Sequence, residues 1–379
     1  MKIGVPREVK TKEYRVGMIP SGVEQLVGSG HQVYIEKGAG EKSGFCDSEY
    51  AEAGASIVKS PGEIYDQCEM IIKVKEPQPE EYHLLKPGQI LFAYLHLAPV
   101  PELTKVLQEK KVTAIAYETL QEKGILPLLD PMSQIAGEVA PLVGSYFLAA
   151  HNGGSGKLIS GATGVTPARV LIIGSGTVAK SAAKVAAGMG AEVVIMGRNR
   201  HSMAKLEETL PANISTVYSN RYNLEKILPT VDIVIGAVYI TGEKTPKLIT
   251  REMLFLCKRG SILVDVSIDQ GGSIETSHPT THEDPVFEVD GVLHYCVANI
   301  PGSYPATSTQ ALANATVTYA KRIADLGWRE AVLNDAAIYS GVNVAGGFVT
   351  NEAVAKTHGI TYRELRDIIA LCPAYEVSI

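Results

Sequence analysis

The sequence has few cysteines, and none of them are spaced as a metal or redox motif. They are odd in number and include no CxxC pair: Cys46, Cys68, Cys257, Cys296 and Cys372. A disulfide framework or a zinc site is therefore not expected. Thiols in this pattern are typical of a reduced, cytoplasmic protein, in which they are mostly buried.

Long hydrophobic runs and an excess of positive charge are also absent. No stretch approaches the ~18 consecutive apolar residues of a membrane-spanning helix. The first residues enter a strand pattern at once, without the apolar region of a signal peptide. The net charge of −6 argues against nucleic acid or an anionic membrane as the main partner. We expect a soluble, cytoplasmic protein that acts on small molecules.

A chain of 379 residues is longer than one hydrophobic core usually supports, so two domains are expected. Short apolar strands alternate with helical segments, which is typical of parallel α/β sheets. Strands are predicted over 2–5, 32–35, 70–74, 90–93 and 113–116, and then over 169–173, 192–196, 215–218, 232–235, 261–264 and 292–295. Helices are predicted over 21–27, 101–110, 132–150 and 308–326.

The two long helices, rich in small residues, are expected to carry the chain between the domains. The predicted fold class is α/β, with two doubly wound parallel-sheet domains. A Rossmann cofactor domain over 131–304 would be inserted into a discontinuous substrate domain made of 1–130 and 305–379.

The clearest motif is an apolar strand that runs into a glycine turn and then a helix. Gly174 allows a tight turn, Gly176 lets the backbone approach a phosphate, and Ala179 lets the helix pack closely on the strand. Backbone N–H groups at the start of that helix, around Thr177 and Val178, would face the anion. The motif predicts a dinucleotide site, although glycine pairs also end strands for packing reasons alone.

The end of the following strand lacks the carboxylate that commonly binds the ribose 2′-hydroxyl of NAD. Gly197 stands there, followed by Arg198, Asn199 and Arg200. An arginine at this point suits the 2′-phosphate of NADP. The sequence therefore mildly favours NADP or dual use over strict NAD. The structural alternative is a solvated basic turn with no specific role.

Four polar residues follow predicted strands at the edge where ligands bind in open parallel sheets: Lys75, His96, Asp269 and Asn299. A cation, an imidazole and a carboxylate are what hydride transfer to a carbonyl substrate requires. Each also has a structural alternative. Lys75 would pair with Glu76, His96 would be a satisfied histidine, and Asp269 would cap the turn at 271–272.

These segments resemble the alanine dehydrogenase family, which is related to pyridine nucleotide transhydrogenase. The resemblance runs from Met1 to about Val354. Its motifs are GVPRE (4–8), EYRVG (13–17), KVKEP (73–77), YLHLA (94–98), PMS (131–133), DQGG (269–272), VANIP (297–301), TST (307–309) and GVNV (341–344).

The resemblance implies reversible oxidative deamination of L-alanine to pyruvate and ammonium with a nicotinamide cofactor. It implies that Arg15 binds the substrate carboxylate, that Lys75 contacts the carboxylate and oxo oxygen, and that His96 and Asp269 are the catalytic pair. It further implies cofactor contacts by Ser133, Gly174, Gly176, Ser219 and Asn299, and a homohexamer.

Gly197 departs from the family, whose NAD-dependent members carry an aspartate there, and Ala179 stands where many members have glycine. Two alternatives remain open. One is a related dehydrogenase of another small amino acid, and the other is a transhydrogenase-like NAD(P)-binding module. No metal site is predicted.

Overall fold

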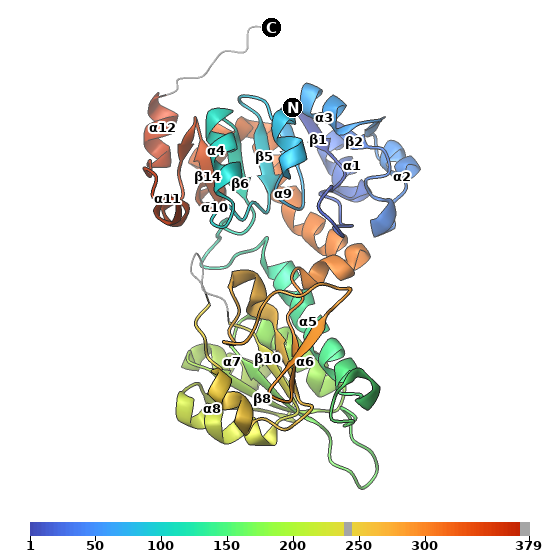
Figure 1. Cartoon of the computed structure of the whole chain (residues 1–379). Coiled ribbons are helices and arrows are strands. Elements are labelled where there is room, and N and C mark those ends of the chain that lie inside the picture. Colours follow the sequence, from blue (N-terminus) through green and yellow to red (C-terminus); the bar gives the residue numbers. More distant parts are fainter. Residues whose placement is uncertain (239–244, 372–379) are drawn as a thin grey trace. The chain divides into compact units, whose positions relative to one another are not determined.

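The computed structural model describes residues 1–238 and 245–371, so Cys372 lies outside the described residues. The chain divides into two compact units (Figure 1). Unit 1 comprises Met1–Met132 and Gly302–Ile379, and unit 2 comprises Ser133–Pro301. The blue and red ends of the chain therefore share one unit, whereas the green and yellow middle forms the other.

Unit 1 is built on an eight-stranded sheet in the order β15-β14-β6-β5-β4-β1-β2-β3. Strands β1 to β6 are parallel, whereas β14 pairs antiparallel with both β6 and β15. The strands are β1 (Lys2–Val5), β2 (Gln32–Glu36), β3 (Ser56–Val58), β4 (Met70–Ile72), β5 (Ile90–Ala93), β6 (Thr113–Ala116), β14 (Val342–Ala345) and β15 (Phe348–Val349).

Helices of unit 1 begin where the sequence supplies start signals. Proline stands in the first turn of α1, α3 and α4, where a missing N–H costs nothing, and the Ser60 hydroxyl caps α3. The helices are α1 (Pro20–Gly28), α2 (Asp47–Glu52), α3 (Pro61–Gln67), α4 (Pro101–Glu109), α9 (Pro305–Asn334), α10 (Ala336–Gly341), α11 (Glu352–His358) and α12 (Leu365–Leu371). Helix α9 contains a break at Gly327, whose φ is 77°.

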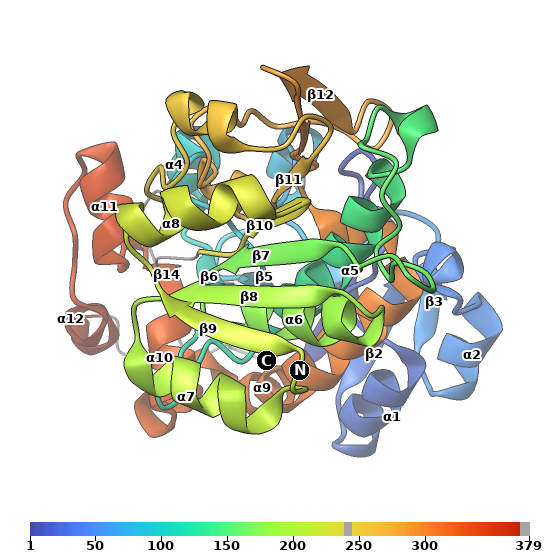
Figure 2. The ribbon, with the colours of Figure 1, turned by 90° about the horizontal axis from the view of Figure 1, so that it is seen from below.

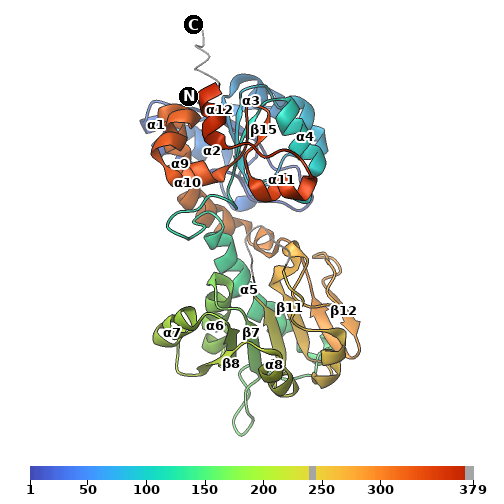
Figure 3. The same ribbon diagram turned by 90° about the vertical axis from the view of Figure 1, so that its left-hand side faces the viewer.

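Unit 2 is built on a seven-stranded sheet in the order β12-β13-β11-β10-β7-β8-β9. Figure 2 shows β10, β7, β8 and β9 in this order, and Figure 3 shows β12 at the outer edge. The elements are β7 (Arg169–Ile173), α6 (Thr177–Gly188), β8 (Glu192–Gly197), α7 (Arg200–Thr209), β9 (Ile214–Tyr218), α8 (Arg221–Ile227), β10 (Ile233–Gly236), β11 (Ile262–Asp265), β12 (Val286–Val289) and β13 (Val292–Tyr295). Helix α5 (Asp130–Phe147) spans the boundary between the units in the sequence.

The α/β fold class is confirmed, and every predicted strand is present within a residue or two of its expected bounds. Both sheets are mainly parallel, as predicted, and antiparallel pairs that involve β12, β14 and β15 make them mixed. These strands and β3 were missed. Two of the antiparallel pairs turn at Asp290-Gly291 and Gly346-Gly347, which are ordinary hairpin signals.

Both sheets share one strand order around their centres. In unit 1 it reads β3-β2-β1-β4-β5-β6, and in unit 2 it reads β9-β8-β7-β10-β11-β13. Each order reverses direction once, between β1 and β4 and between β7 and β10. Ligands of doubly wound sheets bind beyond the carboxyl ends of the strands at such a switch point. Each unit therefore has one place where its topology favours a ligand.

Candidate functional site

The glycine turn of unit 2 lies at its switch point. Gly174 follows β7 with φ 136°, and a Cβ atom on it would lie 2.2 Å from the carbonyl oxygen of Ala237, just after β10. Gly176 is the N-cap of α6, and a Cβ atom on it would meet nothing within 4 Å. Ala179 is fully buried against the sheet. The turn is tight on its inner side and open on its outer side, which fits a dinucleotide pyrophosphate.

The other residues expected around this turn occupy defined positions in unit 2. Thr177 and Val178 are the first residues of α6, and Ser133 lies in the first turns of α5; all three are half-buried. Gly197 is the last residue of β8, and the Ser219 amide after β9 donates to the Gly197 carbonyl oxygen at 2.9 Å.

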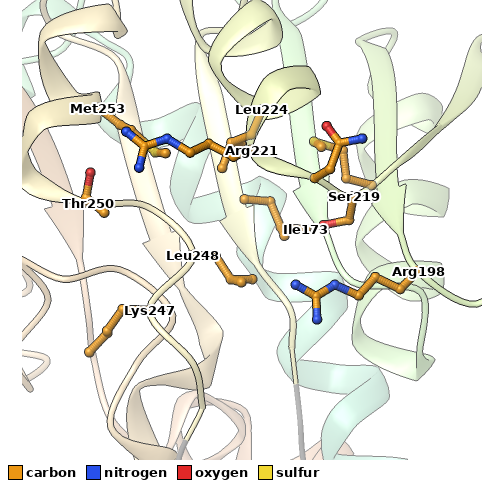
Figure 4. A pocket seen from close by; sticks show the side chains of 11 residues that line it. Ile173, Arg198, Ser219, Arg221, Leu224, Lys247, Leu248, Thr250 and Met253 are labelled. Carbon is orange, nitrogen blue, oxygen red and sulfur yellow. The ribbon is translucent and has the colours of Figure 1, made fainter.

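A pocket of about 220 Å³ lies beyond the carboxyl ends of β7, β8 and β9 (Figure 4). Its apolar lining comprises Ile173, Met196, Leu224, Leu248 and Met253. Its polar lining comprises Arg198, Ser219, Asn220, Arg221, Lys247 and Thr250. A lining that combines apolar side chains with arginine, lysine and hydroxyl groups suits an adenine and its ribose.

The basic turn contributes one arginine to this pocket. Arg198 is exposed, lines the pocket and makes no ion pair with any residue that the structure describes. The Asn199 side chain instead caps α7 by accepting from the Ser202 amide, and Arg200 is the first residue of that helix. Sequence reasoning missed Arg221, which lines the same pocket and pairs with Glu225 at 2.6 Å.

The glycine at position 197 allows close packing around it. A Cβ atom there would lie 3.0 Å from both Met203 Cγ and Ser175 Cβ. An aspartate at this position would require both the Met203 side chain and Ser175, in the glycine turn, to move by a few tenths of an ångström. Position 197 thus has no carboxylate, and the next residue, Arg198, adds a positive charge to the pocket.

In unit 1, Arg15 is held by a fork of two hydrogen bonds. Its Nε and Nη2 donate to the two carboxylate oxygens of Glu13 at 2.7 and 2.6 Å, and both side chains are almost fully buried. Its Nη1 points at the Met132 sulfur, 3.0 Å away. Burial lowers the pKa of a guanidinium, but the bonds and charge of Glu13 outweigh burial, so the Arg15 pKa is raised. Arg15 is therefore a fixed, permanent cation.

Lys75 lies three residues after β4, in a segment that a buried ion cluster holds. Glu8 accepts from the amides of Val74 and Lys75 at 2.6 and 3.4 Å. The Lys73 ammonium binds Glu8 at 3.2 Å and Glu81 at 2.8 Å, and its side chain has no exposed surface. Since Glu8 follows β1 and Lys73 follows β4, the cluster joins the two strands of the switch point.

His96 has an unusual backbone conformation, and one carboxylate contacts its backbone while another contacts its ring. Its φ is 45°, and its amide and that of Leu95 donate to Glu118 at 2.7 and 3.1 Å. Its Nδ1 lies 3.3 Å from Oε2 of Glu76, whose other oxygen binds the Lys10 ammonium. Left-handed backbone at a non-glycine residue persists only where its surroundings hold it, and such residues cluster at functional sites.

Asp269 and Asn299 lie together in unit 2. Asp269 belongs to a 3-10 turn, Val266–Gln270, that follows β11, and its carboxylate accepts from the Asn299 amide at 3.4 Å. The neighbouring Asp265 accepts from the amides of Ser273 and Ile274, and Lys247 donates to the carbonyls of residues 271, 272 and 274. Sequence reasoning missed Asp265 and Lys247, which fix the loop that carries Asp269.

The predicted residues thus fall into two groups. Unit 1 carries Arg15, Lys75 and His96 in the segments that follow β1, β4 and β5, and unit 2 carries the glycine turn, the pocket, Asp269 and Asn299. Among the described helices, none has the length and apolar character needed to cross a membrane. The described residues also contain no group of three or more metal-ligating side chains.

Two family models match nearly the whole chain. The model "Alanine dehydrogenase/PNT, N-terminal domain" matches residues 4–136, and "Alanine dehydrogenase/PNT, C-terminal domain" matches residues 140–352. An alanine dehydrogenase of Methanococcus maripaludis is 50% identical over 364 residues, which are 96% of this chain and 98% of the relative.

Solved structures of related proteins share the fold of this chain. A structure of an L-alanine dehydrogenase has a TM-score of 0.91 and 44% identity, over 95% of this chain and 99% of its own. A transhydrogenase from Sinorhizobium meliloti has a TM-score of 0.79 at 23% identity, over 92% of this chain and 100% of its own, and so shares the fold. With both family models and a relative at 50% identity, the chain belongs to the alanine dehydrogenase/PNT family.

Proposed function

We propose that this chain is an alanine dehydrogenase, which interconverts L-alanine with pyruvate and ammonium using a nicotinamide cofactor. The observation that carries the proposal is the match to proteins of that name over almost the full length of the chain. The geometry agrees, because unit 1 holds a buried cation, Arg15, and a histidine, His96, that the Glu76 carboxylate contacts, and unit 2 has a glycine turn that suits a dinucleotide.

We propose residues 1–130 and 305–379 as the substrate domain and 131–304 as the cofactor domain. Arg15 would bind the substrate carboxylate, since a guanidinium already fixed by Glu13 loses little freedom on binding. Lys75 would contact the carboxylate and the oxo oxygen. A carboxylate anchor of this kind sets the position of the substrate α-carbon.

His96 and Asp269 would move the protons. The His96 imidazole would exchange a proton with the carbonyl or carbinolamine oxygen, and Asp269 would deprotonate water or stabilise the cationic imine. The nicotinamide, when bound, supplies the acceptor or donor of the hydride. The residues that would contact the dinucleotide are Ser133, Gly174, Gly176, Thr177, Val178, Ser219 and Asn299.

For the cofactor, the family implies NAD, and we propose that this chain also accepts NADP. Arg198 supports this, because it lines the pocket beyond β8 with no carboxylate at Gly197 to repel a 2′-phosphate. Arg221 brings a second guanidinium to the same pocket. We further propose a cytoplasmic homohexamer, as the resemblance implies.

The test is a panel of amino acids against both cofactors with the purified full chain. L-alanine should give the highest kcat/KM, with each added methylene costing about 1–3 kcal/mol of transition-state binding. Much faster turnover of another small amino acid would favour a related dehydrogenase. No turnover of any amino acid, with retained NAD(H) binding, would favour a transhydrogenase-like module.

The cofactor proposal needs its own comparison. The ratio of kcat/KM for NADPH and NADH should fall in both Gly197→Asp and Arg198→Ala, with Arg200→Ala as the matched control on the same turn. A ratio that strongly favours NADH in the wild type and does not change in Arg198→Ala would mean that the turn is only solvated.

A further inference from the structure

The Glu76 carboxylate is the group that faces the His96 ring most directly. Oε2 of Glu76 lies 3.3 Å from Nδ1 of the ring. The Glu76 side chain is 7% exposed, whereas the His96 side chain is 40% exposed. The Glu76 carboxylate is thus buried next to the His96 ring, and the exposed part of that ring can reach solvent or a ligand.

The two oxygens of Glu76 serve different partners. Oε1 binds the Lys10 ammonium and also lies 3.4 Å from the Gln78 side-chain nitrogen, whereas Oε2 faces His96. Burial alone would raise the pKa of Glu76, but the hydrogen bonds and charges of His96 and Lys10 outweigh it and lower that pKa well below its ordinary value. Glu76 is therefore ionised and can only accept hydrogen bonds.

An acceptor-only group at Nδ1 fixes the tautomer of the ring. A neutral imidazole carries one proton, so donation from Nδ1 to Glu76 leaves the lone pair on Nε2. The backbone of His96 is already fixed from the other side by Glu118, which accepts from the amides of Leu95 and His96. Ring orientation and backbone conformation thus have separate supports.

We propose that Glu76, with Lys10 on its second oxygen, is a positioning residue that holds His96 as the Nδ1–H tautomer and so makes Nε2 its proton-exchanging atom. This rests on the proposed function, because it concerns the histidine of that reaction. In the proton step, Nε2 takes the proton of the substrate oxygen or returns it, while the Nδ1 proton stays on the ring. Glu76 itself exchanges no proton.

Lys10 makes the proposal testable with an uncharged isostere. In Glu76→Gln, the Lys10 ammonium will hold the amide oxygen and turn the amide NH₂ toward Nδ1. That donor forces the proton onto Nε2, which is the wrong tautomer for accepting one. In Lys10→Met/Glu76→Gln the amide can turn over and present its oxygen to Nδ1, since Gln78 donates to Oε1 only at 3.4 Å.

The first measurement is steady-state kinetics of alanine oxidation by the full chain. We expect Glu76→Gln to lose about 10²-fold in kcat, with KM for alanine changed less than about threefold. Glu76→Asp, which keeps the charge, should retain most of kcat. The double variant should recover about tenfold over Glu76→Gln. Glu109→Gln, an exposed glutamate on α4, is the matched control.

The second measurement does not depend on turnover. Ring ¹⁵N shifts of His96 in histidine-labelled protein, assigned by comparison with His96→Gln, should show Nδ1–H in the wild type and in Glu76→Asp, and Nε2–H in Glu76→Gln. The same tautomer in wild type and Glu76→Gln would overturn the proposal. So would a double variant slower than Glu76→Gln, because a purely structural role predicts additive loss. A wild type inactive on alanine would instead refute the proposed function and leave the tautomer result standing.

Discussion

Replacing Lys73 with methionine tests the ion cluster that joins β1 and β4. Lys73 is fully buried between Glu8 and Glu81, which are 2% and 3% exposed. Methionine fills a similar volume but leaves two buried carboxylates without their cation. Removing one partner of a buried ion pair costs about 3–5 kcal/mol. For a unit of this size that corresponds to a fall in Tm of about 6–20 °C.

The assay follows unit 1 alone. Trp328 in α9 is the only tryptophan in the chain and lies in unit 1, so its fluorescence during urea unfolding reports that unit. The difference in the free energy of unfolding between the wild type and Lys73→Met, here called the deficit, should also depend on pH. Burial already raises the pKa of Glu8, and the loss of Lys73 will raise it further. A raised folded-state pKa stabilises at low pH, so the deficit should shrink as the pH falls towards about 4.3.

The control is Lys86→Met in the same unit. Lys86 pairs with Asp66 at 2.6 Å, but both side chains are exposed, so its loss should cost no more than about 0.5 kcal/mol. Equal stability of Lys73→Met and Lys86→Met at pH 7 would refute the reasoning, as would a Lys73→Met deficit that is the same at pH 4.5 and pH 7.

Three further predictions concern unit 2. Gly174→Ala should weaken NADH binding at least tenfold by fluorescence titration, because the new Cβ would lie 2.2 Å from a carbonyl oxygen at a φ of 136°. Arg198→Ala should lower kcat/KM for NADPH about tenfold and that for NADH less than twofold, since one exposed charge-assisted bond is worth about 1.5 kcal/mol. Asp232→Asn should cost about 1–3 kcal/mol at pH 7 by urea unfolding, because Lys157, Lys258 and the Arg169 amide bind that carboxylate.

The first two of these predictions each have a control variant, and the third has a predicted pH dependence. Gly188→Ala in α6, where a Cβ meets nothing, should leave NADH binding unchanged. Arg200→Ala should leave the cofactor ratio unchanged. Although burial raises the pKa of Asp232, its lysine and amide partners lower it overall. The wild type should therefore have a higher free energy of unfolding than Asp232→Asn above about pH 3.9. This difference should disappear as the pH falls through the lowered pKa of Asp232. An advantage that grows in acid would contradict this account.

The parts of the fold that depend on local sequence were predictable. The glycine turn follows from the spacing of Gly174 and Gly176, because a tight turn and an open helix start are properties of a few adjacent residues. Strands buried on both faces, such as β5, read as continuous apolar runs. Strand β14 did not, since a polar asparagine interrupts its apolar residues and its pairing with β6 and β15 depends on the fold.

The positions of the candidate residues could be predicted from the sequence, whereas their contacts could not. His96 and Asp269 stand out as polar residues that follow strands, but the side chains that contact them do not. Glu76 faces His96 across twenty positions of the chain, and Glu118 across twenty-two. Nothing in the spacing of these acids distinguishes them from solvated surface glutamates. Arg221 was missed for the same reason, because only the fold brings β8 and β9 to one pocket.

The pairing of β6 with β14 has a consequence for how the chain is made. Val342 pairs with Ile115, so the sheet of unit 1 is completed only after all of unit 2 has been synthesised. At typical ribosomal speed that interval is on the order of ten seconds or more. During it β6 is an unprotected sheet edge, rich in apolar residues, of the kind that recruits other chains. A nascent chain stalled before residue 342 should therefore depend on chaperones, whereas unit 2, whose strands are contiguous in sequence, can fold while synthesis continues.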